Sequence, residues 1–188
     1  MKGSLETRLT DIVTQNQDVM HLLRICRSLN LKSWCIGAGV IRNMVWDMLH
    51  DAPYRGASDL DLVFFDKILD PSYDKLITDK ISKLYTSVRW DVTNQAHVHV
   101  WYGDLHQTSV RPYQSLEEAI STWPEYCTSV GISLQANDDI CIYAPFGLED
   151  LFSLTVRHNP ARASREVFEN RVETKFCIAR WPNLKIFV

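Results

Sequence analysis

Hydrophobic positions in the first half of the chain alternate between helical and strand-like spacing. An apolar series from Leu9 to Cys26 recurs every three to four residues, as on one face of a helix. A short apolar run follows at 33–36, and helical spacing returns over 40–50. Leu60 to Phe65 is the clearest strand in the chain. The pattern therefore predicts helix, strand, helix and strand in that order.

The alternation continues with a predicted helix over 71–85 and a predicted strand over 87–93. Strands that alternate with helices favour an α/β sheet, so we expect a small mixed sheet flanked by helices. Further on, the pattern predicts a short helix over 116–123 and a last helix over 165–180. Two strands, over 129–134 and 139–143, are predicted on either side of a turn at Asn137-Asp138.

No stretch rich in glycine and serine divides the sequence. A length of 188 residues with 46% hydrophobic positions suits a single domain with its own core. We therefore expect one domain over 1–188, with a possible subdomain seam near 145 and a mainly helical C-terminal extension over 146–188.

Charge and cysteine content narrow the function classes. The formal net charge of -3 gives no overall basic field for nucleic acid. The segment 157–188 differs, with seven Lys or Arg against three Glu. It could hold an anionic substrate, although a solvated helix face explains most of these charges. Five scattered cysteines without a C-x-x-C pair argue against zinc or a disulfide-linked partner. No run has membrane-spanning length, so we expect a cytoplasmic protein.

Two aspartates begin the clearest strand. Side chains alternate along a strand, so Asp59 and Asp61 project from one face while Leu60 points into the core. Carboxylates about 7 Å apart along a strand can share hard cations, for which Mg²⁺ (or Mn²⁺) is the natural candidate. Taken alone, the pair is better explained as a strand start and a solvent-facing acid.

A glycine-rich turn precedes this strand. Gly37-Ala38-Gly39 lies between a predicted strand and a predicted helix, where backbone N–H groups are available to a phosphate. Arg42, one turn into the helix, could add a charged fork to the same anion. The turn lacks the Lys-Ser/Thr of a P-loop, and by itself it is also consistent with an ordinary strand-to-helix connection.

Together, the run from Ile36 to His50 and the strand at Ser58-Asp59-Leu60-Asp61-Leu62 resemble the head motif of the DNA polymerase β-type nucleotidyltransferase superfamily. CCA-adding and poly(A)-adding enzymes have the most similar order of motifs. The arrangement also resembles small bacterial nucleotidyltransferase-like proteins of unestablished substrate. Two departures are Ala38, where a second glycine or serine is usual, and Asn43, where Asp is frequent.

The resemblance implies a third metal-binding carboxylate on a neighbouring strand. Asp91 is the best-placed candidate, with Asp104 and Asp139 as alternatives, and an edge-strand surface acid explains Asp91 nearly as well. Asn94 and Gln95 follow closely and could hydrogen-bond a base or ribose.

The function implied by the resemblance is transfer of a nucleoside monophosphate from a nucleoside triphosphate to a hydroxyl, with release of pyrophosphate. In that role Asp59, Asp61 and Asp91 would be the catalytic metal ligands. The nucleotide would contact Gly37, Ala38, Gly39, Arg42, Asn94 and Gln95. The acceptor stays open between a small molecule, a protein and a short RNA end. A nucleotide-binding or partner-binding module that has lost catalysis, and a metal-dependent phosphohydrolase, are the alternatives.

Overall fold

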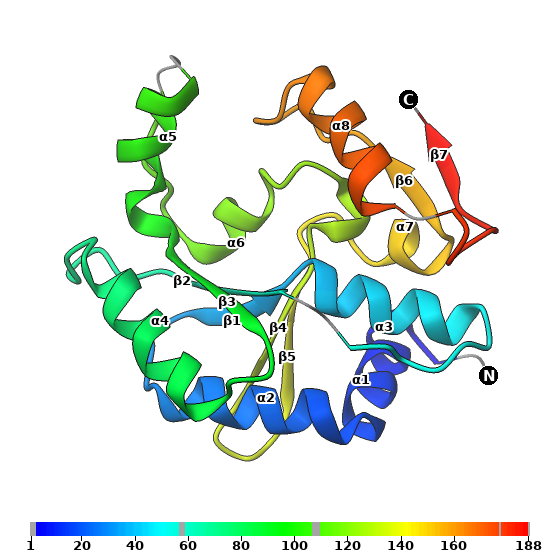
Figure 1. The fold of residues 1–188 in the computed structure, drawn as a ribbon, viewed down its shortest axis with the longest axis horizontal. Helices are drawn as coiled ribbons and strands as arrows, with labels where there is room; N and C mark the ends of the chain where they lie inside the picture. The colour runs from blue at the N-terminus through cyan, green and yellow to red at the C-terminus, as the bar shows by residue number, and fades with distance from the viewer. Residues whose placement is uncertain (1–2, 57–58, 107–109, 177, 188) are drawn as a thin grey trace.

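A five-stranded mixed sheet forms the centre of the protein in the computed structural model (Figure 1), which describes residues 3–56, 59–106, 110–176 and 178–187. Its strand order is β3-β2-β1-β4-β5. The pair β2–β3 is parallel and the other three pairs are antiparallel. The strands are β1 (Trp34–Gly37), β2 (Asp59–Phe64), β3 (Arg89–Asn94), β4 (Gly131–Leu134) and β5 (Ile140–Tyr143). The predicted mixed sheet flanked by helices is confirmed.

The two N-terminal helices correct the single helix predicted from the first apolar series. The chain forms α1 (Leu5–Gln15) and α2 (Gln17–Ser28), separated by Asn16. The Asn16 side chain accepts a hydrogen bond from the Val19 backbone N–H at 3.1 Å and so caps the second helix. Helical spacing of apolar residues is the same on both sides of this cap, which is why periodicity alone misses the break.

Helices α3 (Gly39–Leu49) and α4 (Tyr73–Leu84) are close to the predicted ranges. Helix α4 connects β2 to β3, as a parallel strand pair requires. It buries Ile77 and Ile81 against the sheet. The main core continues through the buried faces of β1, β2 and α3, where Ile36, Ile41 and Leu62 are fully enclosed. The carboxylate strand therefore rests on a densely packed support.

Between β3 and β4 the chain forms helical elements that the sequence only partly predicts. A 3₁₀ turn at Gln95–His97 leads into α5 (Val98–His106), which was not predicted. Helix α6 (Leu116–Ile120) and a 3₁₀ turn at Tyr126–Thr128 follow. In Figure 1, α5 and α8 rise on opposite sides above the sheet, with α6 between them.

The C-terminal part contains two short strands beside its helices. It contains α7 (Glu149–Phe152), β6 (Thr155–Arg157), α8 (Arg165–Lys175) and β7 (Lys185–Phe187). Strands β6 and β7 pair in parallel as a separate two-stranded sheet. The last helix ends at Lys175, five residues short of the predicted end, because the chain turns to bring Trp181 against α3. The subdomain seam near 145 stays a prediction.

A buried carboxylate attaches this C-terminal part to α3. Asp47 is 1% exposed and accepts hydrogen bonds from both Nε (3.0 Å) and Nη2 (2.6 Å) of Arg180. The indole Nε1 of Trp181 donates to the same carboxylate at 2.9 Å. Trp46, next in sequence, packs edge-on against Trp181, with ring centroids 5.2 Å apart. The segment after α8 is therefore part of the core that supports the sheet.

Cys26, Cys35, Cys127 and Cys141 are free thiols within the described ranges. None of the helices described is both long and apolar enough to cross a membrane.

Candidate functional site

The site is built on the parallel pair of β2 and β3. Register places Asp61 directly opposite Asp91 and Asp59 opposite Arg89. Neighbouring strands lie about 4.8 Å apart, so the Asp61 and Asp91 backbones are immediate neighbours. Leu60 and Leu62 are buried, which puts Asp59 and Asp61 on the opposite face, as alternation predicts.

The electrostatics of Asp61 reflect this crowding. Burial, followed by the negative charges of Asp91 and Asp59, raises the pKa of Asp61 to about 6. Lys175 and Arg171 oppose the shift from α8. The Lys175 Nζ lies 3.7 Å from Oδ2 of Asp59. The carboxylate cluster therefore carries more negative charge than the two helix cations offset, which is the condition that favours a bound cation.

The metal-free protein should lose stability through Asp61 as the pH rises from about 4 to about 6. A carboxyl whose pKa is higher in the folded than in the unfolded state binds extra protons on folding within that window. Its ionisation therefore destabilises the fold. Urea denaturation in EDTA at about pH 4.5 and about pH 7 would measure this. The stability advantage of Asp61→Asn over the wild type should grow with pH, and an advantage that is equal at both pH values would contradict the prediction.

The predicted Gly37-Ala38-Gly39 turn lies beside the carboxylates. Gly37 ends β1, and a Cβ there would overlap the ring of Trp123. Ala38 lines the same cavity as Asp61 and Asp91. It precedes α3 without giving a side-chain cap, so the first-turn N–H groups of this helix are open to another acceptor.

Ala38 has φ 45° and ψ -98°, a backbone conformation that L-residues with a Cβ adopt at a cost. Ala38→Gly should therefore stabilise the fold by roughly 1 kcal/mol, the strain outweighing the extra backbone entropy of glycine. Ala136→Gly is the matched control, because Ala136 lies in the exposed β4–β5 turn and its own φ is not positive. This change should be neutral or destabilising. Chemical denaturation of both variants tests this, and equal losses of stability would argue against strain at Ala38.

Arg42 lies next to the turn, since a Cβ at Gly39 would be 3.9 Å from its Nη2, but its side chain also has partners inside the protein. Its side chain is 7% exposed, and its guanidinium lies among the rings of Trp46, Phe176 and Trp181, at 5.2–5.7 Å from their centroids. It donates to Oδ1 of Asn43 from Nε (3.1 Å) and Nη2 (2.8 Å). Burial lowers the pKa of Arg42. The guanidinium thus joins α3 to the C-terminal segment, and its contact with a phosphate stays a prediction.

Asn94 is also engaged inside the protein. Its Oδ1 accepts the backbone N–H groups of Asp66 and Ala96, each at 3.1 Å, and its Nδ2 donates to the Asp66 carbonyl at 2.7 Å. With 1% exposure it shapes the end of β3, which corrects its expected role at a base or ribose. Gln95, by contrast, lines the cavity.

The cavity has a volume of about 360 Å³ and lies between β2–β3, α5, the segments on either side of α6, and α8. Asp61, Asp91 and Arg171 contribute charges to its wall. Aromatic rings make up much of the remaining lining, which includes Trp101, Tyr102, Tyr113 and Trp123. A concave site with an apolar wall and a few converging charges is typical of a small-ligand pocket.

Arg171 is a site residue that the sequence analysis missed. It forms a bidentate ion pair with the fully buried Glu125, with Nε–Oε1 at 2.5 Å and Nη2–Oε2 at 3.1 Å. Glu125 also accepts from Thr128 Oγ1 at 2.5 Å. Arg171 and Lys175 are one helical turn apart, so i, i+4 spacing within the basic C-terminal segment was the available signal. Their long-range partners were not visible in the sequence.

Of the alternative third acids, Asp139 lies in the exposed β4–β5 turn and the Asp104 side chain is outside the described residues. Within the described part of the chain, no group of three or more His, Cys, Asp and Glu side chains could by itself hold a metal ion.

Comparison with known proteins gives a consistent picture. The sequence profile of a family described as nucleotidyltransferase matches residues 24–186. An NMR structure described as revealing a CCA-adding enzyme head domain is 29% identical, with 96% of this chain and 95% of that chain covered and a TM-score of 0.78. A search of curated proteins finds no match.

Larger enzymes share the fold. A CCA-adding enzyme in an apo form is 10% identical with a TM-score of 0.57, over 96% of this chain and 42% of that chain. A complex of a CCA-adding enzyme with CTP is 13% identical with a TM-score of 0.53, over 99% and 44%. This chain therefore spans less than half the length of those two enzymes.

Proposed function

Because the chain belongs to the nucleotidyltransferase family, we propose that it is a metal-dependent nucleotidyltransferase acting on a nucleoside triphosphate. In the reaction a bond forms between an acceptor hydroxyl oxygen and the α-phosphorus. The bond from that phosphorus to the bridging oxygen of the β-phosphate breaks, and pyrophosphate leaves. The observation that carries the proposal is the in-register pairing of Asp61 with Asp91 at the wall of the cavity.

The donor set fits Mg²⁺ or Mn²⁺. Asp61 and Asp91 offer only oxygen atoms, with Asp59 beside them, and Mg²⁺ is usually held by one or two carboxylates together with substrate phosphates and water. A site that needs phosphate oxygens to complete it agrees with the absence of a three-ligand protein cluster among the described residues. Bound there, the metal would activate the acceptor hydroxyl and stabilise the leaving oxygens.

Residues of the chain itself would position the nucleotide. The Ala38 N–H donates to the Val130 carbonyl, so the uncapped start of α3 from Gly39 onward would offer the backbone N–H groups to the phosphates. Arg171, fixed by Glu125, presents positive charge at the cavity wall, where it can stabilise charge that develops on phosphate oxygens. Gln95 is the remaining candidate for a ribose or base contact.

The experiment is Mg²⁺-dependent binding of the four nucleoside triphosphates, followed by transfer of α-³²P label to an acceptor panel of RNA 3′ ends, proteins and small hydroxyl compounds. Labelled product together with released pyrophosphate supports the proposal. Conversion of the labelled triphosphate to a shorter labelled nucleotide, with no label on any acceptor, indicates a phosphohydrolase. Metal-dependent binding without turnover across the whole panel indicates a module that has lost catalysis, and no binding at all rejects the site.

A further inference from the structure

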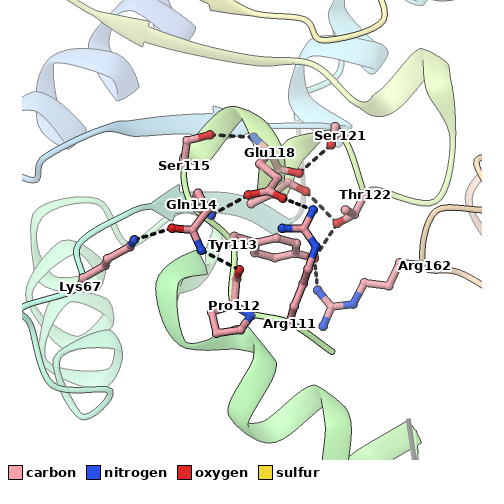
Figure 2. A network of polar contacts seen from close by, with 11 residues as sticks. Lys67, Arg111, Pro112, Tyr113, Gln114, Ser115, Glu118, Ser121, Thr122 and Arg162 are labelled. Carbon is pink, nitrogen blue, oxygen red and sulfur yellow. Dashed lines mark hydrogen bonds and ion pairs between the residues drawn. The ribbon is translucent and has the colours of Figure 1, made fainter. Parts of the chain in front are cut away.

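Arg162 crosses the cavity from the loop before α8 to the wall formed by α5 and the segment before α6. Its Cζ lies 3.5 Å from the ring centroid of Tyr102 and 5.2 Å from that of Tyr113. Its Nη1 donates to the Tyr113 hydroxyl, which in turn pairs with Thr122 Oγ1 at 2.6 Å. Figure 2 shows the guanidinium joined to the Tyr113 hydroxyl, which is also joined to Thr122. The group is therefore fixed in orientation by ring stacking and one hydrogen bond.

The opposite edge of this guanidinium has no partner among the side chains that the structure describes. Nε and Nη2 are buried, and neither has a hydrogen-bond acceptor among the described residues. None of the Asp and Glu residues whose side chains the structure describes forms an ion pair with Arg162. Buried donors without acceptors are costly, and a buried charge is normally paired. The Nε–Nη2 edge is the fork that binds carboxylate or phosphate through two parallel hydrogen bonds.

We propose that Arg162 anchors an oxyanion subsite, a place for a carboxylate or phosphate group, and that the acceptor substrate carries this group. An oxyanion satisfies both free donors and compensates the charge, whereas a neutral base edge would satisfy the donors only. The second half of the proposal rests on the proposed nucleotidyl transfer.

The acceptor is the better source of the oxyanion because Arg162 belongs to a different part of the cavity from the metal-binding carboxylates. Arg162 contacts Tyr102 and Tyr113 on the wall formed by α5 and the segment before α6, whereas Asp61 and Asp91 lie on β2 and β3. Triphosphate oxygens of the donor are expected at Asp61 and at the start of α3. Arg162, which packs against two tyrosine rings, is therefore available to a second molecule.

Inorganic phosphate is the first probe, titrated into the metal-free wild-type protein with the arginine Nε–Hε resonances observed by NMR. The Arg162 resonance, assigned with Arg162→Lys, should move on binding. Calorimetry should then give roughly tenfold weaker phosphate binding for Arg162→Gln, the size expected for losing a charged fork. Arg165→Gln, three residues along and paired at the surface with Glu169, is the matched control and should bind like the wild type.

A stationary Arg162 resonance, or unchanged phosphate affinity in folded Arg162→Gln, overturns the oxyanion subsite. The wild-type NMR titration decides the matter even if Arg162→Gln does not fold.

The source is tested with Mg²⁺ and a nonhydrolysable ATP analogue. Phosphate that still binds the nucleotide-saturated protein, with unchanged analogue affinity in Arg162→Gln, assigns the oxyanion to the acceptor. Displacement of phosphate by the analogue, with roughly tenfold weaker analogue binding in Arg162→Gln, overturns that assignment in favour of the donor. If the analogue does not bind at all, the proposed function fails while the phosphate titration still reports on Arg162.

Discussion

Asp61→Asn and Asp91→Asn should each lower nucleotidyl transfer by roughly two to three orders of magnitude, because each removes a carboxylate that would bind the metal and leaves a neutral amide. The two residues lie opposite each other on neighbouring parallel strands and line one cavity. Asparagine keeps the shape of the side chain, so the loss should come from charge and coordination. Pyrophosphate release and transfer of α-label at saturating nucleotide measure the effect.

A gain in stability should accompany this loss of transfer. Asp61 is held beside two like charges in the metal-free protein, so Asp61→Asn should unfold at a higher urea concentration than the wild type at neutral pH. This separates a chemical defect from misfolding. Asp79→Asn, on the exposed face of α4, is the control and should keep full transfer. Wild-type activity in both site variants would place the chemistry elsewhere.

Arg171→Met should destabilise the fold by about 3–5 kcal/mol, since it leaves the carboxylate of Glu125 buried without a cation. Glu125 is 0% exposed, whereas the Arg171 side chain is 30% exposed. Glu125→Gln should therefore destabilise the fold less than Arg171→Met, because the released guanidinium can turn toward water. Denaturant unfolding of the two variants tests the order.

The double variant Glu125→Gln/Arg171→Met completes a cycle and should be less destabilised than the sum of the two single changes. The exposed pair of Arg165 and Glu169 on the same helix is the internal comparison. Arg165→Met should alter stability by less than about 1 kcal/mol. Additive changes in the Glu125–Arg171 cycle would mean that this pair contributes no more than a surface contact.

The parts of the fold that were predicted depend on local patterns. Helix α3, strand β2 and the alternation of Asp59 and Asp61 follow from residue spacing within a few turns of chain. The break at Asn16 and the whole of α5 were missed, because caps and short apolar helices change periodicity very little. Strands β6 and β7 are three residues each and pair only through tertiary contact.

In the site, too, local sequence patterns do not determine which side chains face a ligand. The sequence supplied the types of residue around the turn, but whether a polar side chain faces a ligand depends on its other partners. Arg42 is enclosed by rings from the C-terminal segment, and Asn94 is saturated by backbone groups of its own region. Arg171 approaches Asp61 from a distant helix, so proximity in sequence could not indicate it.

Because Arg180 and Trp181 anchor α3, they limit how short a fragment of the chain can be and still keep this fold. A version trimmed back to the five-stranded sheet would retain both carboxylates of the site. It would also lack Arg180 and Trp181, which donate to Asp47, and would expose Trp46 and Arg42 to solvent. Helix α3, which directly follows the cavity-lining residue Ala38, would then expose the face that packs on the C-terminal segment. Boundaries for expression or for fusion to another protein therefore belong beyond residue 181, not at the end of the sheet.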